Sequence, residues 1–266
     1  MAVNMFSQLK IIMKLWKASI IQSMEYRGSF IFSIFANFFD FIFGLLQYLV
    51  FFTAAKSIAG WSSDNMLALY SVFMFIYSLQ FIFLYPNIAV LGEMVNTGGL
   101  DLLLTKPLDA RLFVLLRKIS LEELGSLSTS IVLFIWLISK GVFVITFQSV
   151  LLFIISIFSA LIIVYSIYIT LTALAIMLEK MEDASEFIWS LFSFCRYPTD
   201  IYPAKMKFLF FTFFPIAYIS TVPAQTISGL GSTEPVIYGF IISILSLLIS
   251  SAIWKKTIRS YTSAGS

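Results

Sequence analysis

The sequence contains no histidine and only one cysteine, Cys195. Without histidine, the chain alone cannot form an HExxH zinc site, a Ser-His-Asp triad or a histidine proton relay. A single cysteine allows neither an intramolecular disulfide nor a cysteine-rich metal site. The GxxxxGK(S/T) loop that binds nucleotide phosphates is also missing, so any ATP hydrolysis must come from another subunit. We therefore predict no catalytic residue, no metal site and no bound cofactor on this chain.

Charge is scarce as well. Charged residues make up 12% of the 266 positions and hydrophobic residues 60%, with a mean hydropathy of +0.96. A soluble domain carries about 25% charged residues, and one of this length could not bury so much apolar surface. Because the apolar residues form helix-length runs and not short alternating segments, we predict an all-α membrane protein with several crossings.

Residues 1–28 precede the first long apolar run. Within residues 5–21, the apolar side chains gather on one side of a helix and the lysines on another. This stretch is too charged to span a bilayer, so we predict an amphipathic helix at the cytoplasmic interface. Packing against the rest of the protein is the alternative. No short apolar core with a cleavage site follows, so we expect no cleaved signal peptide.

Apolar runs long enough to cross a bilayer, which takes about 20 residues, follow along the chain. They occupy residues 29–53, 66–90, 124–145, 149–178 and 235–254. The interval 184–230 is ambiguous because it holds two shorter apolar stretches. Either residues 184–195 cross and 208–222 are re-entrant, or the first stretch is a cytoplasmic flank and the second crosses.

Lysine and arginine set the predicted orientation. They gather in residues 1–28, in the loop 92–118 and in the tail after Trp254, whereas the intervening short loops contribute only Lys56 and Lys140. Both termini and the central loop are therefore predicted to be cytoplasmic, with an even number of crossings, best six. In the ambiguous interval, charge alone favours keeping its basic residues inside: Arg196, Lys205 and Lys207.

A polar stripe is predicted in the first crossing, where Asn37, Asp40, Gly44 and Gln47 share one helix face. A carboxylate at this depth costs roughly 2.5–3.5 kcal/mol, so it seldom faces lipid. The stripe either lines a translocation path or subunit interface, or it forms helix–helix hydrogen bonds with a protonated Asp40. Aromatic stripes that are more often packing, but are candidates for a greasy substrate, contain Tyr70, Tyr77, Tyr165 and Tyr168.

Two blocks carry a resemblance to a known family. Residues 92–108 read GEMVNTGGLDLLLTKPL, which resembles the G-x-hydrophobic…G-x-Leu-Asp-x-x-Leu-x-(Lys/Arg)-Pro-Leu segment of ABC-2-type permeases. Residues 196–203, read RYPTDIYP, and 214–224, read FPIAYISTVPA, are similar to the Tyr-Pro and Pro-Ala signatures of the bacterial six-helix branch. The resemblance covers essentially the whole chain.

The resemblance implies an ABC-2 exporter fold in a bacterial plasma membrane. An interfacial helix (1–28) would precede a six-helix transmembrane domain (29–266), with a cytoplasmic coupling segment (92–118) between crossings two and three. A re-entrant region (199–230) would lie on the outside between crossings five and six. Its marked residues are Arg196, Tyr197, Pro198, Tyr202, Pro203, Pro215 and Pro223. The implied ATPase-coupling residues are Gly92, Glu93, Gly98, Gly99, Asp101, Leu104, Lys106 and Pro107.

The coupling segment has a chemistry that suits docking, since it carries charges of both signs. Gly98 and Gly99 permit a tight turn, and Pro107 is expected to end a short helix that begins near Leu100. A merely solvated loop is the alternative. The implied partners are an ATP-binding cassette ATPase subunit, two per transporter, which holds ATP and Mg. A second copy of the chain or a related permease, and membrane lipid, complete the set; no nucleic acid is expected.

Two other functions compete with that of an exporter permease. An ATP-independent channel or ion-coupled carrier would use Asp40, although the chain shows no obvious internal repeat. An intramembrane enzyme would use the Glu122–Glu123 pair, but membrane proteases with paired glutamates also need histidines. The sequence does not identify the cargo.

Overall fold

The described part of the chain is built from helices. The computed structural model describes residues 5–25, 27–54, 56–105, 109–178 and 181–261. Apart from one isolated bridge between Ile58 and Trp61, these residues contain no β-structure. The predicted all-α class is confirmed for them.

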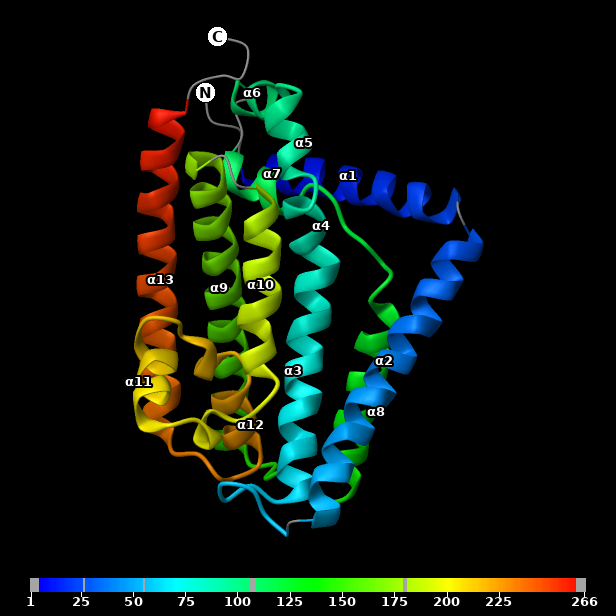
Figure 1. Ribbon diagram of the computed structural model, residues 1–266, viewed down its shortest axis with the longest axis vertical. Coiled ribbons are helices and arrows are strands. Elements are labelled where there is room, and N and C mark those ends of the chain that lie inside the picture. Colours follow the sequence, from blue (N-terminus) through cyan, green and yellow to red (C-terminus); the bar gives the residue numbers. More distant parts are fainter. Residues whose placement is uncertain (1–4, 26, 55, 106–108, 179–180, 262–266) are drawn as a thin grey trace.

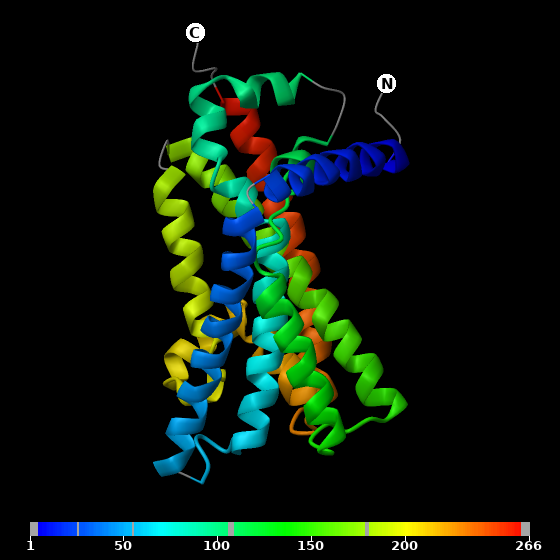
Figure 2. The same cartoon turned by 90° about the vertical axis from the view of Figure 1, so that its right-hand side faces the viewer.

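Most of the long helices form a bundle of roughly parallel rods, and α1 (Met5–Glu25) lies across one end of it (Figures 1 and 2). The bundle consists of α2 (Arg27–Ala54), α3 (Ser63–Phe83), α8 (Leu124–Ser139), α9 (Phe147–Leu178), α10 (Met181–Cys195) and α13 (Thr233–Ser260).

Short helices cap the two ends of the bundle (Figure 1). The end near α1 carries α4 (Tyr85–Ile88), α5 (Leu91–Asn96), α6 (Gly99–Leu104) and α7 (Ala110–Leu116), and we refer to it as the α6 end. The opposite end, the α12 end, carries η1 (Thr199–Ile201), α11 (Ala204–Thr212), η2 (Ile216–Tyr218) and α12 (Thr221–Ile227). The last turns of α13 return to the α6 end.

Among the described residues, four helices are long and apolar enough to cross a membrane: Arg27–Val50, Ser63–Val95, Phe147–Leu178 and Thr233–Ser260. The pair 204–212 and 216–227, bent by 76°, makes a fifth if it is one broken span. The 16 residues of α8 rise only about 24 Å, less than the roughly 30 Å hydrocarbon core. A multi-pass membrane protein is therefore confirmed at four to five helices, and the count of six stays a prediction.

Two predicted crossings differ from expectation for local reasons: one is broken within its span Ser63–Val95, and the other ends early. The run 66–90 breaks at Leu84, because Pro86 lies in the first turn of α4 and lacks an N–H for a continuous helix. The run 124–145 ends at Ser139, because Gly141 adopts a left-handed conformation with φ +71°.

α3 is the centre of the bundle and α2 is its edge. In an 18-residue apolar stretch of the span Ser63–Val95, which begins with α3, 78% of the residues are buried inside the protein. The corresponding share for α2 is 11%. α2 packs mainly on α8 and α3. The α2–α8 approach is close at Gly125, where an added Cβ would lie 2.3 Å from the Ile34 carbonyl oxygen. Most of the α2 surface is left without a partner in this chain.

The carboxylate of Asp200 connects several segments of the chain at the α12 end. Asp200 accepts hydrogen bonds from the Trp61 indole Nε1 at 3.0 Å and from the Gln225 amide Nε2 at 3.0 Å. Its other oxygen pairs with Lys207 Nζ at 2.5 Å. These contacts join the α2–α3 loop, α11 and α12, and we refer to the four residues as the Asp200 cluster.

Candidate coupling segment and translocation surfaces

The predicted coupling segment forms two short helices that meet at a left-handed glycine. α5 contains Gly92 and Glu93, and α6 begins at Gly99. Gly98 precedes α6 with φ +71°, a conformation that costs a residue with a Cβ about 1–2 kcal/mol. The sequence placed a short helix here, and the structure has one that ends at Leu104. Lys106 and Pro107 lie outside the described residues.

α6 presents one apolar side chain to the surroundings. Leu100 is fully buried and Leu103 nearly so, whereas Leu102 is 68% exposed. Asp101 acts electrostatically on Tyr261, just beyond α13: burial raises the pKa of Tyr261, and the Asp101 carboxylate adds to this rise. The sequence analysis missed Leu102, although an i, i+3 burial pattern on a short helix (100 and 103) indicates that 102 faces outward.

An ion pair fixes the end of the segment to two distant helices. Asp109 caps α7 by accepting from the Arg111 backbone N–H at 3.0 Å, and the Arg111 guanidinium binds both of its carboxylate oxygens at 3.0 and 2.7 Å. The hydrogen bond from Arg111 holds the pKa of Asp109 below its usual value. Arg111 also donates to Ser251 Oγ on α13 at 2.9 Å, and the Asp109 N–H donates to Gln8 on α1 at 3.3 Å. We refer to Asp109 and Arg111 as the α7 clamp.

α1 has one side on the protein and another side exposed. Trp16 Nε1 donates to the Leu116 carbonyl at 2.6 Å, and its ring lies 5.2 Å from that of Phe83. Ile12 is buried beside it, whereas Met13 is 56% exposed. The buried side of α1 suits packing on the protein, and the exposed side suits the membrane interface. Its interfacial role therefore stays a prediction.

The polar stripe of α2 is divided between two surroundings. Asn37 donates to the carbonyl of Glu122, in the connection before α8, at 2.8 Å. Its own backbone carbonyl accepts from Ser126 on α8 at 3.2 Å. Asp40 and Gln47 instead lie on the exposed surface of α2. The structure thus separates the first residue of the stripe, which has a packing role, from two that face outward.

Tyr70 is held between α2 and α3. Its hydroxyl donates to the Phe41 carbonyl at 2.8 Å, and an added Cβ on Gly44 would lie 2.2 Å from the same hydroxyl. Its ring lies 4.8 Å from that of Tyr48, whose hydroxyl donates to the Arg196 carbonyl. The predicted stripe residue Gly44 therefore makes room for a buried tyrosine.

The remaining predicted tyrosines differ in exposure. Tyr168 is buried and donates to Gln80 Oε1 on α3 at 2.9 Å. Tyr165 is half-buried one turn away on α9, and Tyr77 is half-buried against Phe81 at 4.5 Å between ring centroids. The structure does not bring these tyrosines to one surface, and their part in a path stays a prediction.

The prolines of the predicted re-entrant region each lie at or near the start of a helix, where a missing N–H costs nothing. Pro198, Pro203 and Pro215 immediately precede η1, α11 and η2, and Pro223 is the third residue of α12. Two other marked residues pack nearby. The ring centroid of Tyr197 lies 5.8 Å from that of Tyr48, and the ring centroid of Tyr202 lies 5.1 Å from that of Phe210.

These features can be compared with known protein families. The model of the family described as ABC-2 family transporter protein matches residues 38–265. The chain belongs to the ABC-2 transporter family. No curated protein matches it. Members of this permease family are membrane subunits that are generally not catalytic, and membership implies association with an ATP-binding cassette ATPase.

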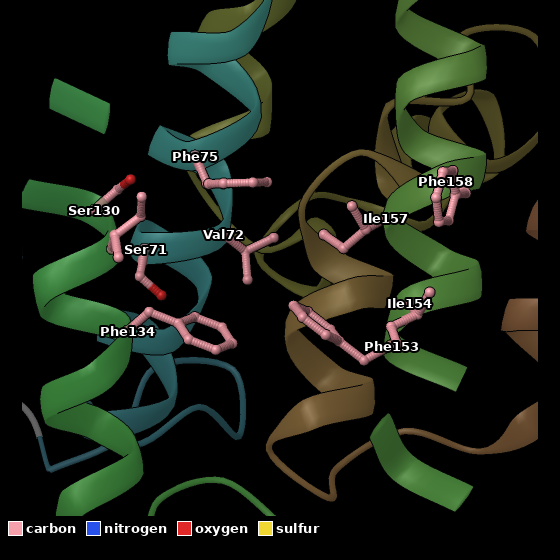
Figure 3. A pocket seen from close by; sticks show the side chains of 10 residues that line it. Ser71, Val72, Phe75, Ser130, Phe134, Phe153, Ile154, Ile157 and Phe158 are labelled. Carbon is pink, nitrogen blue, oxygen red and sulfur yellow. The ribbon is translucent and has the colours of Figure 1, made fainter. Parts of the chain in front are cut away.

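The permease has an apolar cavity between α3, α8 and α9 (Figure 3). It has a volume of about 280 Å³, and the side chains that surround it are mostly aromatic or aliphatic, with two serine hydroxyls at one side. Residues that line it include Ser71, Phe75, Ser130, Phe134, Phe153 and Ile157.

A second cavity, of about 440 Å³, lies at the α6 end, and we refer to it as the junction cavity. α1, α4, α10 and the 117–123 connection surround it. Its wall differs from that of the first because it combines aromatic rings with carboxylates: Phe81, Tyr85, Trp189, Glu122 and Glu123. In the sequence, the two glutamates were considered only as an enzyme site. Their aromatic neighbours were not predicted, because they come from two distant segments, around Phe81 and Tyr85 and around Trp189.

Proposed function

We propose that the chain is the permease subunit of an ATP-binding cassette exporter, with its α6 end in the cytoplasm. The observation that carries this proposal is that the family-like motif forms α6, a short helix at one extremity of the bundle with an exposed Leu102 (Figure 2). Two cassette subunits, which hold ATP and Mg, would dock on this surface in two copies of the permease or in a pair of related ones. No nucleic acid partner is proposed.

For topology we propose six crossings and a re-entrant hairpin on the outside. Support comes from the position of α11 and α12, which both lie at the α12 end, while α10 extends along the bundle from the α6 end (Figure 1). In the sequence, the rule that basic residues stay on the cytoplasmic side argued against this arrangement, because the hairpin places Arg196, Lys205 and Lys207 toward the outside. Because Lys207 is paired with Asp200, its charge is neutralised locally, and this weakens the objection.

We propose that the exposed face of α2 packs against a second permease. Asp40 and Gln47 lie on this face, and α2 is the least buried of the four membrane-capable helices. A carboxylate left against lipid at mid-helix would cost roughly 2.5–3.5 kcal/mol, whereas a protein neighbour can satisfy it. The subunit contact and the translocation path would then share this surface.

The contacts of the α6 end suggest how movement would spread. A displacement of α6 would reach α13 through Asp101 and Tyr261, and the α7 clamp would carry it to α13 and α1 together. α1 is joined in turn to the first residues of α2. Cassette closure would thereby rock the helices between inward- and outward-facing arrangements.

An ATP-independent channel or ion-coupled carrier is the competing function. The assembled permease and cassette subunits are reconstituted in liposomes, and ATPase activity is measured with Gly98→Ala and Asp101→Asn variants. We expect no hydrolysis by the permease alone and hydrolysis by the complex. In both variants, we expect the permease to lose its effect on the ATPase activity of the cassette subunits. Unchanged coupling in both variants, or ion-driven flux without ATP by the permease alone, would contradict the proposal.

A further inference from the structure

One wall of the junction cavity is a continuous aromatic surface. The rings of Phe81 and Tyr85 stack at 4.5 Å with an interplanar angle of 28°, and Trp189 lies 4.8 Å from Phe81. The Trp189 indole Nε1 donates to the Tyr85 hydroxyl at 3.1 Å, which fixes the orientation of both rings. Aromatic faces fixed in this way attract cations through the ring quadrupole.

A second part of the lining is acidic. Glu122 and Glu123 both line the cavity, and among the described residues Lys118 is the single basic one that does so. Within the described part of the chain, neither glutamate has an ion pair within 4 Å. Burial raises the pKa of Glu123, and the carboxylates of Asp40 and Glu122 add to this rise. The cavity therefore lacks positive charge on its acidic side.

The dimensions and chemistry restrict the occupant. A volume of about 440 Å³ suits a molecule of small-drug size. Among the described residues, no three acidic or cysteine side chains are grouped closely enough to hold a metal ion. An organic cation meets both walls at once, because its charge can face the carboxylates while its substituents cover the rings.

We propose that the junction cavity binds hydrophobic organic cations, that is, protonated amines or quaternary ammonium and phosphonium groups. Trp189 and Tyr85 provide the aromatic platform, and Glu122 and Glu123 provide the counter-charge. As a cargo site this inference rests on the proposed function, since the cavity lies at the end assigned to the cytoplasm, where an exporter collects cargo. Binding itself requires no ATPase.

The test is equilibrium dialysis of tetraphenylphosphonium against the purified permease in maltoside micelles, with empty micelles as background. Tetraphenylborate has nearly the same size and shape but the opposite charge, so it is the matched control ligand. We expect saturable binding of the cation and binding of the anion at least about tenfold weaker.

Variants separate the two walls. The double variant Glu122→Gln and Glu123→Gln is expected to weaken cation binding roughly tenfold. Trp189→Leu is expected to weaken it by roughly 2- to 30-fold, with Trp189→Phe in between. Glu234→Gln, at the start of α13 at the opposite end of the bundle, removes a carboxylate far from the cavity and is expected to leave binding unchanged.

Lys118→Gln gives a result that misfolding cannot imitate. Its backbone is held by Asn87 through hydrogen bonds of 2.9 and 2.8 Å, so the side chain can be changed without loss of these contacts. Removing the repulsive charge is expected to tighten cation binding about two- to fivefold. Equal binding of cation and anion, or no response to the Lys118 and glutamate changes, would overturn the proposal. Neither result bears on ATPase coupling, which the cassette complex tests separately.

Discussion

The Asp200 cluster allows a quantitative prediction, because the single thiol of the chain provides the assay. Cys195 is 2% exposed, so a thiol-reactive fluorophore labels it only after unfolding. Heating the purified permease with such a dye therefore gives a melting temperature without engineered probes. The perturbation is Asp200→Ala, with Asp200→Asn as the isosteric step.

The magnitude follows from the contacts that are lost. The Lys207 pair is partly exposed, with side-chain accessibilities of 43% and 20%, so solvent screening limits it to about 0.5–1 kcal/mol. Trp61 is 2% exposed, and its indole N–H left without an acceptor costs about 1–3 kcal/mol. Together Asp200→Ala is expected to destabilise by about 3 kcal/mol, or roughly 6–10 °C in Tm. Asp200→Asn keeps an acceptor and should lose less than half of that.

Lys205→Ala is the control, since this residue is exposed on α11 near the cluster and its loss changes the net charge by the same magnitude with the opposite sign. We expect its melting temperature to stay within about 1 °C of the parent. If Asp200→Ala melts no lower than Lys205→Ala, the cluster does not hold the α12 end together, and the reasoning from these hydrogen bonds is wrong.

Three further predictions test other parts of the structure. Gly125→Ala pushes a Cβ onto the α2 backbone and should lower the melting temperature by several degrees, whereas Gly28→Ala, which meets nothing within 4 Å, should not. Because the pKa of Asp109 is lowered on folding, its contribution is present above the unfolded value near 3.8 and is lost as pH falls through the lower folded value. Asp109→Asn should therefore be less stable than the parent at neutral pH, with the difference shrinking at acidic pH. Loss of helical circular dichroism on heating measures this, because a thiol-reactive dye does not label at acidic pH. With an impermeant maleimide on intact cells, Ala204→Cys and Phe147→Cys should both be labelled from outside, and labelling of Ala204→Cys only after permeabilisation would favour a crossing at 208–222.

The sequence predicted best where the pattern was long and local. The run 149–178 became α9 (Phe147–Leu178), because a bilayer-length apolar stretch without glycine or proline has few alternatives to a helix. The break at Leu84 and the early end at Ser139 depend on one proline and one glycine. The length of an apolar run does not show such local effects.

The residues that meet across the chain could not be predicted in the same way. Asp200 contacts Trp61, 139 positions earlier, and the cavity wall joins Phe81 to Trp189. The periodicity of apolar residues in the sequence does not predict such contacts, since they depend on how the helices pack against one another. Helical spacing likewise placed Asn37 and Asp40 on one face, but only the position of α8 decides which of them is covered.

The central claim is that α6 is where an ATPase subunit docks, and cross-linking tests it most directly. Leu102→Cys is introduced, with the buried Cys195 left in place, and a cross-linker with one maleimide end and one amine-reactive end is added to the permease–cassette complex in membranes. We predict a permease–ATPase product with Leu102→Cys and none with Phe147→Cys, which is 87% exposed at the opposite end. Equal cross-linking from both positions, or none from Leu102→Cys in a complex that hydrolyses ATP, would contradict the account.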